Sequence, residues 1–88
     1  MSNILVVEDS ERIASFIVKG LQSHGYQVTH TPNGEDALKL SAAAEFDLVI
    51  LDIGLPGIDG FAVLEQLRGS GNEVPVIVLT ARDSVDNT

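Results

Sequence analysis

The fold of this chain is constrained most by short segments of consecutive apolar residues. A strand with one face exposed to solvent would instead alternate apolar and polar residues. The predicted strands 4–7, 47–51 and 76–79 consist of or contain such runs, rich in Ile, Leu and Val, and each is followed by an acidic or hydroxyl residue. Strands that are apolar on both sides are typical of a parallel sheet that helices cover on both faces. Residues 27–30 are a further strand candidate, closed by the turn signal Pro32-Asn33-Gly34.

Segments with the spacing of amphipathic helices lie between these runs. In the first segment, which Gly25 ends, the apolar residues at helical spacing are Ile13, Phe16, Ile17 and Leu21. The second segment covers residues 35–44, with Asn33 as its predicted N-cap and acidic residues in its first turn. The third covers residues 60–68 and is expected to turn Phe61, Leu64 and Leu67 toward the core.

The alternation of strands and helices predicts the α/β class with right-handed crossovers. We expect a flavodoxin-like, doubly wound parallel sheet with the strand order 2-1-3-4. The 88 residues suffice for one small domain, and the sequence contains no repeat or linker. Ligands of such sheets bind outside the carboxyl ends of the strands. Functional residues are therefore expected directly after the apolar runs.

Charge and composition exclude several classes of function. Thirteen acidic residues against five basic ones give a net charge of −8, which repels nucleic acid and attracts cations. The basic residues form no stripe: Arg12, Lys19, Lys39, Arg68 and Arg82. The absence of cysteine excludes disulfides and thiolate sites. No export signal or membrane-length apolar run is present, so we expect a cytoplasmic location without membrane or direct nucleic-acid binding.

The residues that follow the strands suggest a cation site. Glu8 and Asp9 follow the first run, Asp52 the third strand and Thr80 the fourth. Neighbouring strands lie about 4.8 Å apart, so three carboxylates would converge if the first and third strands are adjacent. Two unit charges about 4 Å apart repel by about 4 kcal/mol at an effective dielectric constant of 20. Such a cluster needs a proton or a cation, and its all-oxygen donors favour Mg²⁺.

Each of these residues also has a simpler interpretation when it is taken alone. Asp9 would suit the start of the first helix, where the helix dipole favours a carboxylate. Asp52 precedes a turn, where aspartate is common, and Thr80 would suit the end of a strand. Their agreement with one predicted edge of the sheet favours a joint site. Asp59 is interpreted instead as the cap of the third helix.

Other notable residues have structural interpretations. His24 and His30 lie near the ends of predicted elements and have no partner pattern. We expect surface or structural roles for both. Gly57 and Gly60 lie on either side of the start of the third helix and are expected to serve backbone geometry.

Three segments carry a family resemblance that covers essentially the whole chain. The segments Ile-Leu-Val-Val-Glu-Asp at 4–9, Asp-Leu-Val-Ile-Leu-Asp-Ile-Gly-Leu-Pro-Gly-Ile-Asp-Gly at 47–60 and Val-Pro-Val-Ile-Val-Leu-Thr-Ala at 74–81 occur in order. They resemble the receiver domains of two-component response regulators, of the CheY-like superfamily. The loops after Asp52 and Leu79 look like those of regulators with a winged-helix DNA-binding output domain.

The resemblance implies a role for each site residue. Asp52 would accept a phosphoryl group from a sensor histidine kinase. Asp9 would bind Mg²⁺ directly, and Glu8 would bind it through water or set the local charge. The backbone carbonyl of Gly54 would be another ligand, and the hydroxyl of Thr80 would contact the phosphoryl group and switch the conformation.

The resemblance also implies that residues 1–88 are an incomplete receiver domain of four βα units. Receiver domains have a fifth strand and helix, with a lysine that pairs with the phosphoryl group, and no basic residue here matches it. We therefore expect slow or absent phosphorylation of this chain by itself. We also expect residues 76–79 to form an exposed edge strand that pairs with another copy, as a homodimer or swapped oligomer.

Three alternatives to the phosphoacceptor function are compared with it. One is a receiver-fold interaction module that is not phosphorylated. A haloacid-dehalogenase-like phosphatase would need a second aspartate two residues after Asp52, and Gly54 stands there. A flavodoxin-type cofactor binder would need a phosphate loop where Glu8 and Asp9 place negative charge. The chain is therefore expected not to be a turnover enzyme.

Overall fold

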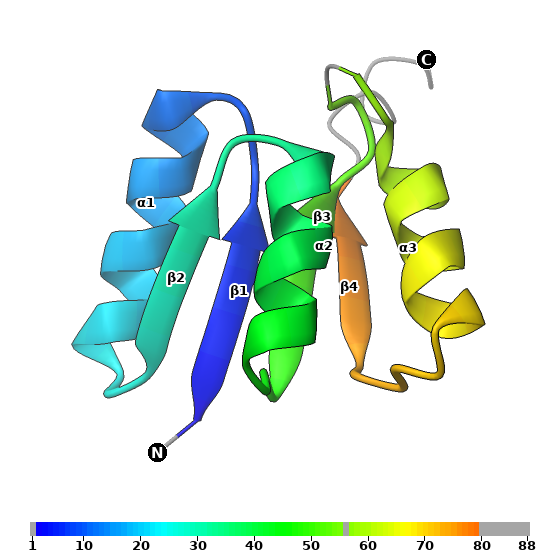
Figure 1. Cartoon of the computed structure of the whole chain (residues 1–88). Helices are drawn as coiled ribbons and strands as arrows, with labels where there is room; N and C mark the ends of the chain where they lie inside the picture. Colours follow the sequence, from blue (N-terminus) through cyan, green and yellow to red (C-terminus); the bar gives the residue numbers. More distant parts are fainter. Residues whose placement is uncertain (1, 56, 80–88) are drawn as a thin grey trace, which may run out of the picture.

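The computed structural model describes residues 2–55 and 57–79, which form one parallel sheet with helices on both faces (Figure 1). The elements are β1 (Asn3–Val7), α1 (Glu11–Ser23), β2 (Gln27–Thr31), α2 (Gly34–Ala43), β3 (Leu48–Asp52), α3 (Gly60–Gly69) and β4 (Val76–Leu79). The strands are hydrogen-bonded in the order β2-β1-β3-β4, and each neighbouring pair is parallel. The predicted fold class and strand order are confirmed.

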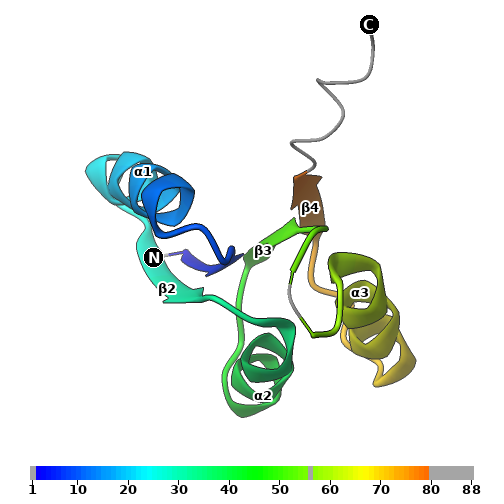
Figure 2. The same ribbon diagram turned by 90° about the horizontal axis from the view of Figure 1, so that it is seen from above.

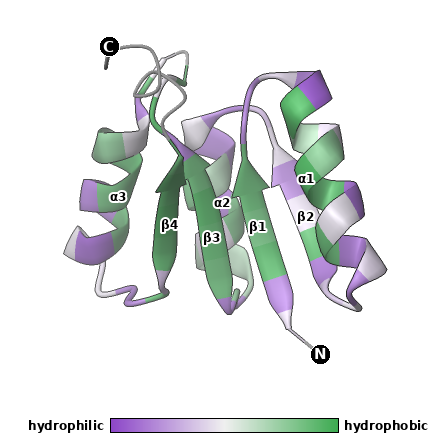
Figure 3. Ribbon diagram, turned by 180° about the vertical axis from the view of Figure 1, so that it is seen from behind, coloured by the Kyte–Doolittle hydropathy of each residue, from purple (hydrophilic) through white to green (hydrophobic). Residues whose placement is uncertain are grey.

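The apolar strands are continuous because the sheet packs against helices on both faces. Seen along the strands, α1 lies on one face, while α2 and α3 lie on the other (Figure 2). Leu5 and Val7 belong to the core cluster that includes residues of α2 and α3, whereas Ile4 and Val6 pack with apolar residues of α1. Successive side chains of a strand point to opposite faces of the sheet. Because helices cover both faces, the side chains that point to either face are apolar. Figure 3 shows the resulting hydrophobic band along β1, β3 and β4.

Each helix begins at a side chain that accepts a backbone N–H. Ser10 Oγ accepts from Ile13 N at 3.4 Å, Asn33 Oδ1 from Asp36 N at 2.8 Å, and Asp59 Oδ1 from Ala62 N at 2.9 Å. The caps predicted at Asn33 and Asp59 are confirmed, and the cap of α1 is Ser10. Within the described ranges, every helix falls short of the length and hydrophobicity that a membrane span requires.

The expected inward face of α3 was wrong at one position. Phe61 is 58% exposed, whereas Val63 and Leu67 are 0% and 3% exposed and lie in the core. Gly60 is also buried, so the helix approaches the sheet through positions 60, 63 and 67, and Leu64 is half-buried beside them. Phe61 is rotated by about 100° from Gly60 because a helix has 3.6 residues per turn. Its side chain therefore points toward solvent.

Candidate metal centre at the carboxyl edge of the sheet

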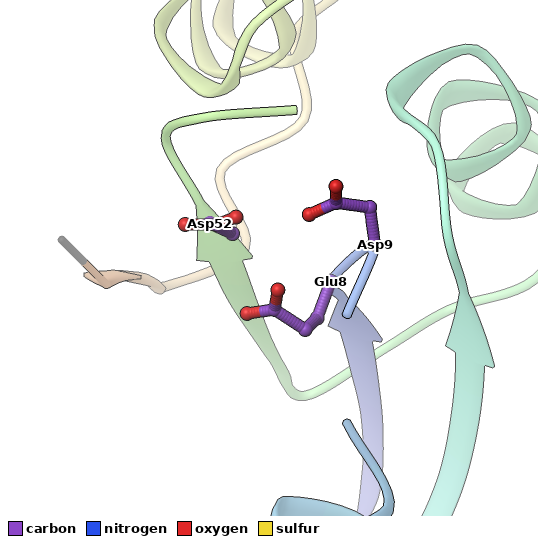
Figure 4. Close-up of side chains that lie close together, drawn as sticks. All are labelled: Glu8, Asp9 and Asp52. Atoms are coloured by element: carbon purple, nitrogen blue, oxygen red, sulfur yellow. The ribbon is translucent and has the colours of Figure 1, made fainter. Parts of the chain in front are cut away.

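Three carboxylates meet where β1 and β3 end side by side. Val7 is paired with Leu51 in the parallel register, so the residues that follow them are neighbours. Glu8, Asp9 and Asp52 each place a carboxylate oxygen within 4.8 Å of the others (Figure 4). The predicted convergence of these three side chains is confirmed.

The three carboxylates differ in their exposure. Glu8 is buried, with 4% of its surface exposed, Asp52 is half-buried and Asp9 is exposed. Burial raises the pKa of Glu8, and the nearby charges of Asp52 and Asp9 and a hydrogen bond with Asp9 raise it further. The backbone N–H of Ser10, 3.1 Å from Glu8 Oε2, opposes this change in pKa. The pKa of Glu8 therefore lies above its ordinary value.

The donor atoms of the site fit a hard divalent cation. All three side chains offer carboxylate oxygens, which are the ligands that Mg²⁺ prefers, together with water and backbone carbonyls. A cation would also compensate the charge of the buried Glu8. Exposed Asp9 and half-buried Asp52 leave the site open to solvent, so an ion that keeps several of its waters can be accommodated.

The acidic turn after β1 is fixed by its backbone. Glu8 N donates to Thr31 O at 3.1 Å, which extends the pairing of β1 with β2 by one residue. Ser10 binds Glu8 through its N–H and caps α1 through its hydroxyl. Ser10 is therefore the cap of α1, and Asp9 lies directly before it, at the start of the helix. Sequence reasoning missed Ser10, although a serine just before a helical pattern is a common N-cap signal.

The backbone at the end of β3 is held by its neighbours. Ile53 N donates to Leu79 O at 3.2 Å, and Gly60 N donates to Ile53 O at 3.0 Å. A β-carbon at Gly60 would lie 2.5 Å from the carbonyl oxygen of Asp52. Gly57 has a φ of +78°, a conformation that favours glycine. The predicted backbone roles of both glycines are confirmed, and the start of α3 abuts Asp52.

The two remaining predicted site residues are Gly54 and Thr80. Gly54 is exposed, and a β-carbon there would meet no atom within 4 Å. The role of its carbonyl as a metal ligand stays a prediction. Thr80 lies outside the described residues, directly after the last residue of β4, so its role as a switch stays a prediction as well.

The sheet order and the acidic cluster define an α/β protein in which three carboxylates meet at the carboxyl edge of a parallel sheet. The model of the response regulator receiver domain family matches residues 4–88, and the chain belongs to this family. It is 42% identical over 85 residues to the transcriptional regulatory protein PcoR of Escherichia coli, which covers 97% of this chain. The chain spans 38% of the length of PcoR.

Solved structures of the family show the same fold. The response regulator TrrA from Thermotoga maritima in complex with Mg²⁺-BeF superposes with a TM-score of 0.90 at 40% identity, covering 98% of this chain and 75% of TrrA. TrrA in complex with the histidine kinase ThkA gives a TM-score of 0.88 at 39% identity, covering 100% of this chain and 76% of TrrA. The chain is thus a receiver domain of the two-component response regulators.

Proposed function

We propose that this receiver domain takes a phosphoryl group from a sensor histidine kinase onto Asp52, with Mg²⁺ bound at the same edge of the sheet. The observation that carries the proposal is the approach of Glu8, Asp9 and Asp52 to within 4.8 Å of one another. Asp9 and Asp52 would hold the ion directly, with the carbonyl of Gly54, and Glu8 would act through water or through its charge.

In the proposed transfer, Asp52 acts as the nucleophile. One carboxylate oxygen attacks the phosphorus of the kinase phosphohistidine, the new P–O bond forms, and the P–N bond breaks with release of the imidazole. When bound, Mg²⁺ neutralises negative charge on the carboxylates and on the phosphoryl oxygens. Half-buried Asp52 keeps its carboxylate accessible while β3 fixes its backbone.

The comparisons support this proposal through what is known of TrrA. That protein was solved with Mg²⁺-BeF and with the histidine kinase ThkA. We extend both to this chain: Mg²⁺ as its cofactor, and a sensor kinase as its partner in the cytoplasm. The hydroxyl of Thr80, next to the end of β4, would contact the phosphoryl group and transmit the change to an output that regulates transcription.

Labelling with acetyl phosphate tests the proposal. In the presence of Mg²⁺, any phosphoryl group that residues 1–88 take up, at the slow rate expected without the family lysine, should be found by mass spectrometry on the peptide that contains Asp52. The label should be lost in Asp52→Asn and when EDTA removes the metal. Asp59→Asn is the matched control, because this exposed residue of the following loop caps α3 and asparagine caps equally well. Labelling that survives in Asp52→Asn would contradict the proposal.

The proposal assigns a single phosphoryl acceptance, not turnover. A dehalogenase-like phosphatase carries an aspartate as acid and base two residues after its nucleophile. Gly54 occupies that position and has no side chain to donate a proton.

A second candidate function is self-association through β4. Within residues 2–55 and 57–79, β4 pairs with β3 and with no second strand, and the Ile77 side chain on it is 50% exposed. An edge strand of this kind can pair with another chain, as expected of an interaction module. Sedimentation or light scattering that shows a compact monomer at tens of micromolar would contradict it. A dimer that Ile77→Lys dissociates would support it.

A further inference from the structure

The main chain of Glu8 is bonded to β2 through both of its polar groups. Its N–H donates to Thr31 O at 3.1 Å, and its carbonyl oxygen accepts a hydrogen bond from His30 Nε2 at 2.9 Å. A carbonyl oxygen can only accept, so Nε2 carries a proton in this contact. The neutral Nε2–H tautomer and the imidazolium ion both meet that requirement.

The hydrogen bond from His30 fixes a peptide plane that leads into the acidic cluster. The carbonyl of Glu8 and the N–H of Asp9 belong to one rigid planar unit. A hydrogen bond that fixes the Glu8 carbonyl therefore also fixes the position of the Asp9 Cα, from which the Asp9 side chain extends. Asp9 is exposed, so surrounding side chains do not pack around it to fix its position. The course of the main chain therefore helps to decide where the Asp9 carboxylate lies.

We propose that His30 is a positioning residue of the metal centre, acting through the Glu8 carbonyl on Asp9. This inference rests on the proposed function, because it needs Mg²⁺ to bind at the carboxylates. His30 lies on β2, next to the N-terminal part of α1, and lines a hollow there with Glu11, Ala14 and Ser15. From this place, its imidazole reaches the turn after β1, and it is not one of the three residues whose carboxylates meet at the site.

The chain offers a matched control in its other histidine. His24 Nδ1 is also 2.9 Å from a backbone carbonyl oxygen, that of Gly20, and both histidine side chains are exposed. The His24 contact closes the last turn of α1, at the opposite end of that helix from the acidic turn. The two residues therefore differ in which carbonyl they hold, and only His30 holds one beside a proposed ligand.

Calorimetric titration of the full chain with Mg²⁺ tests the inference. His30→Leu should weaken Mg²⁺ affinity by about 3- to 10-fold, as expected for the loss of one hydrogen bond that orients the site. His30→Gln should restore most of the affinity, because its amide N–H reaches about as far as Nε2. His24→Leu should bind Mg²⁺ as the unchanged chain does. The free energy of unfolding in EDTA is measured for each variant.

The possible outcomes separate the inference from the function on which it rests. If the unchanged chain binds no Mg²⁺, the proposed function fails and this inference with it. If the unchanged chain binds and His30→Leu binds equally well, the inference alone is overturned. It is also overturned if His30→Gln does not restore Mg²⁺ affinity. The same holds if His24→Leu weakens Mg²⁺ binding as much as His30→Leu does, since the loss of affinity would then reflect a general loss of folding stability.

A measurement on the unchanged chain covers the case in which His30→Leu does not fold. Long-range ¹H–¹⁵N spectra report which imidazole nitrogen carries the proton. We expect a proton on Nε2 of His30 in the neutral ring. A neutral ring protonated at Nδ1 alone could not donate to Glu8 and would overturn the inference.

Discussion

Gly60 lies so close to Asp52 that a β-carbon on the glycine would stand 2.5 Å from the Asp52 carbonyl oxygen and 2.8 Å from the Cα of Ile53. The hydrogen bond from Gly60 N to Ile53 O, at 3.0 Å, closes the same contact. The first turn of α3, which Asp59 caps, is thereby packed against the end of the strand that carries the proposed phosphoacceptor. Any side chain at position 60 must therefore displace either the first turn of α3 or the end of β3.

Gly60→Ala should lower the free energy of unfolding by about 1–3 kcal/mol, the range seen when an atom is forced into a packed site. The backbone of Asp52 cannot move away easily because β3 is hydrogen-bonded on both sides. Urea unfolding followed by circular dichroism measures the change. Gly69→Ala, at the other end of α3, is the control: a β-carbon there meets nothing within 4 Å, so this variant should be as stable as the unchanged chain or slightly more stable. Equal stability of the two variants would contradict the prediction.

The meeting of Asp9 and Asp52 could be predicted from the sequence because it depends on strand order alone. Once continuous apolar runs indicate a parallel sheet, the residues after adjacent strands must share one edge. The contact of His30 with the Glu8 carbonyl could not be predicted in this way. It depends on the rotamer of one side chain and on the path of a turn that belongs to another strand. Neither leaves a periodic pattern in the sequence.

The face of α3 was predicted less well, for a related reason. The helix has apolar residues at neighbouring positions: Phe61, Val63, Leu64 and Leu67. Hydrophobicity alone therefore does not decide between two rotations of the helix about its axis that differ by about one residue. The structure selects the rotation in which Gly60 touches β3, since only a glycine fits there. Steric contact with the backbone therefore decides the orientation of the helix, and Phe61 is left exposed.

Paired truncations in α3 test this orientation. Val63 is fully buried, so Val63→Ala should lower the free energy of unfolding by about 2 kcal/mol through lost burial and a small cavity. Phe61→Ala removes a larger side chain, yet it should cost less than about 1 kcal/mol because that side chain is 58% exposed. Urea unfolding of both variants is the measurement. A larger loss for Phe61→Ala would show that the helix is rotated toward the face first expected.

Glu8→Gln tests the raised pKa of Glu8 through the pH dependence of stability. A carboxyl whose pKa is higher in the folded state contributes stability below its unfolded pKa, near 4.5, and loses that contribution as the pH rises through the folded value. Glutamine mimics the protonated form at every pH. In EDTA, Glu8→Gln should therefore be more stable than the unchanged chain at neutral pH, and the difference should shrink toward zero as the pH falls to 4.5.

Unfolding curves at several pH values measure this difference. Glu65→Gln is the control, because the Glu65 side chain is exposed on α3, away from the acidic cluster. Glu65→Gln makes the same change in charge, and its stability relative to the unchanged chain should not vary with pH in the way expected for Glu8→Gln. A stability difference for Glu8→Gln that grows as the pH falls would reverse the expected sign and contradict the assigned burial effect.

Binding of Mg²⁺ should stabilise the folded chain, because the carboxylates of Glu8, Asp9 and Asp52 come together only when β1 and β3 are paired. A ligand that binds the folded state alone adds about 2.7 kcal/mol at about one hundred times its dissociation constant. The melting temperature should therefore rise with Mg²⁺ and fall back in EDTA.

Asp9→Asn should abolish most of this rise, since it removes the charge of an exposed proposed ligand without leaving a cavity. Glu45→Gln changes the net charge equally, but Glu45 lies at the opposite edge of the sheet, before β3 begins, and it should respond to Mg²⁺ like the unchanged chain. An equal rise in Asp9→Asn and in Glu45→Gln would mean that the ion acts by general screening of negative charge and not at the acidic cluster.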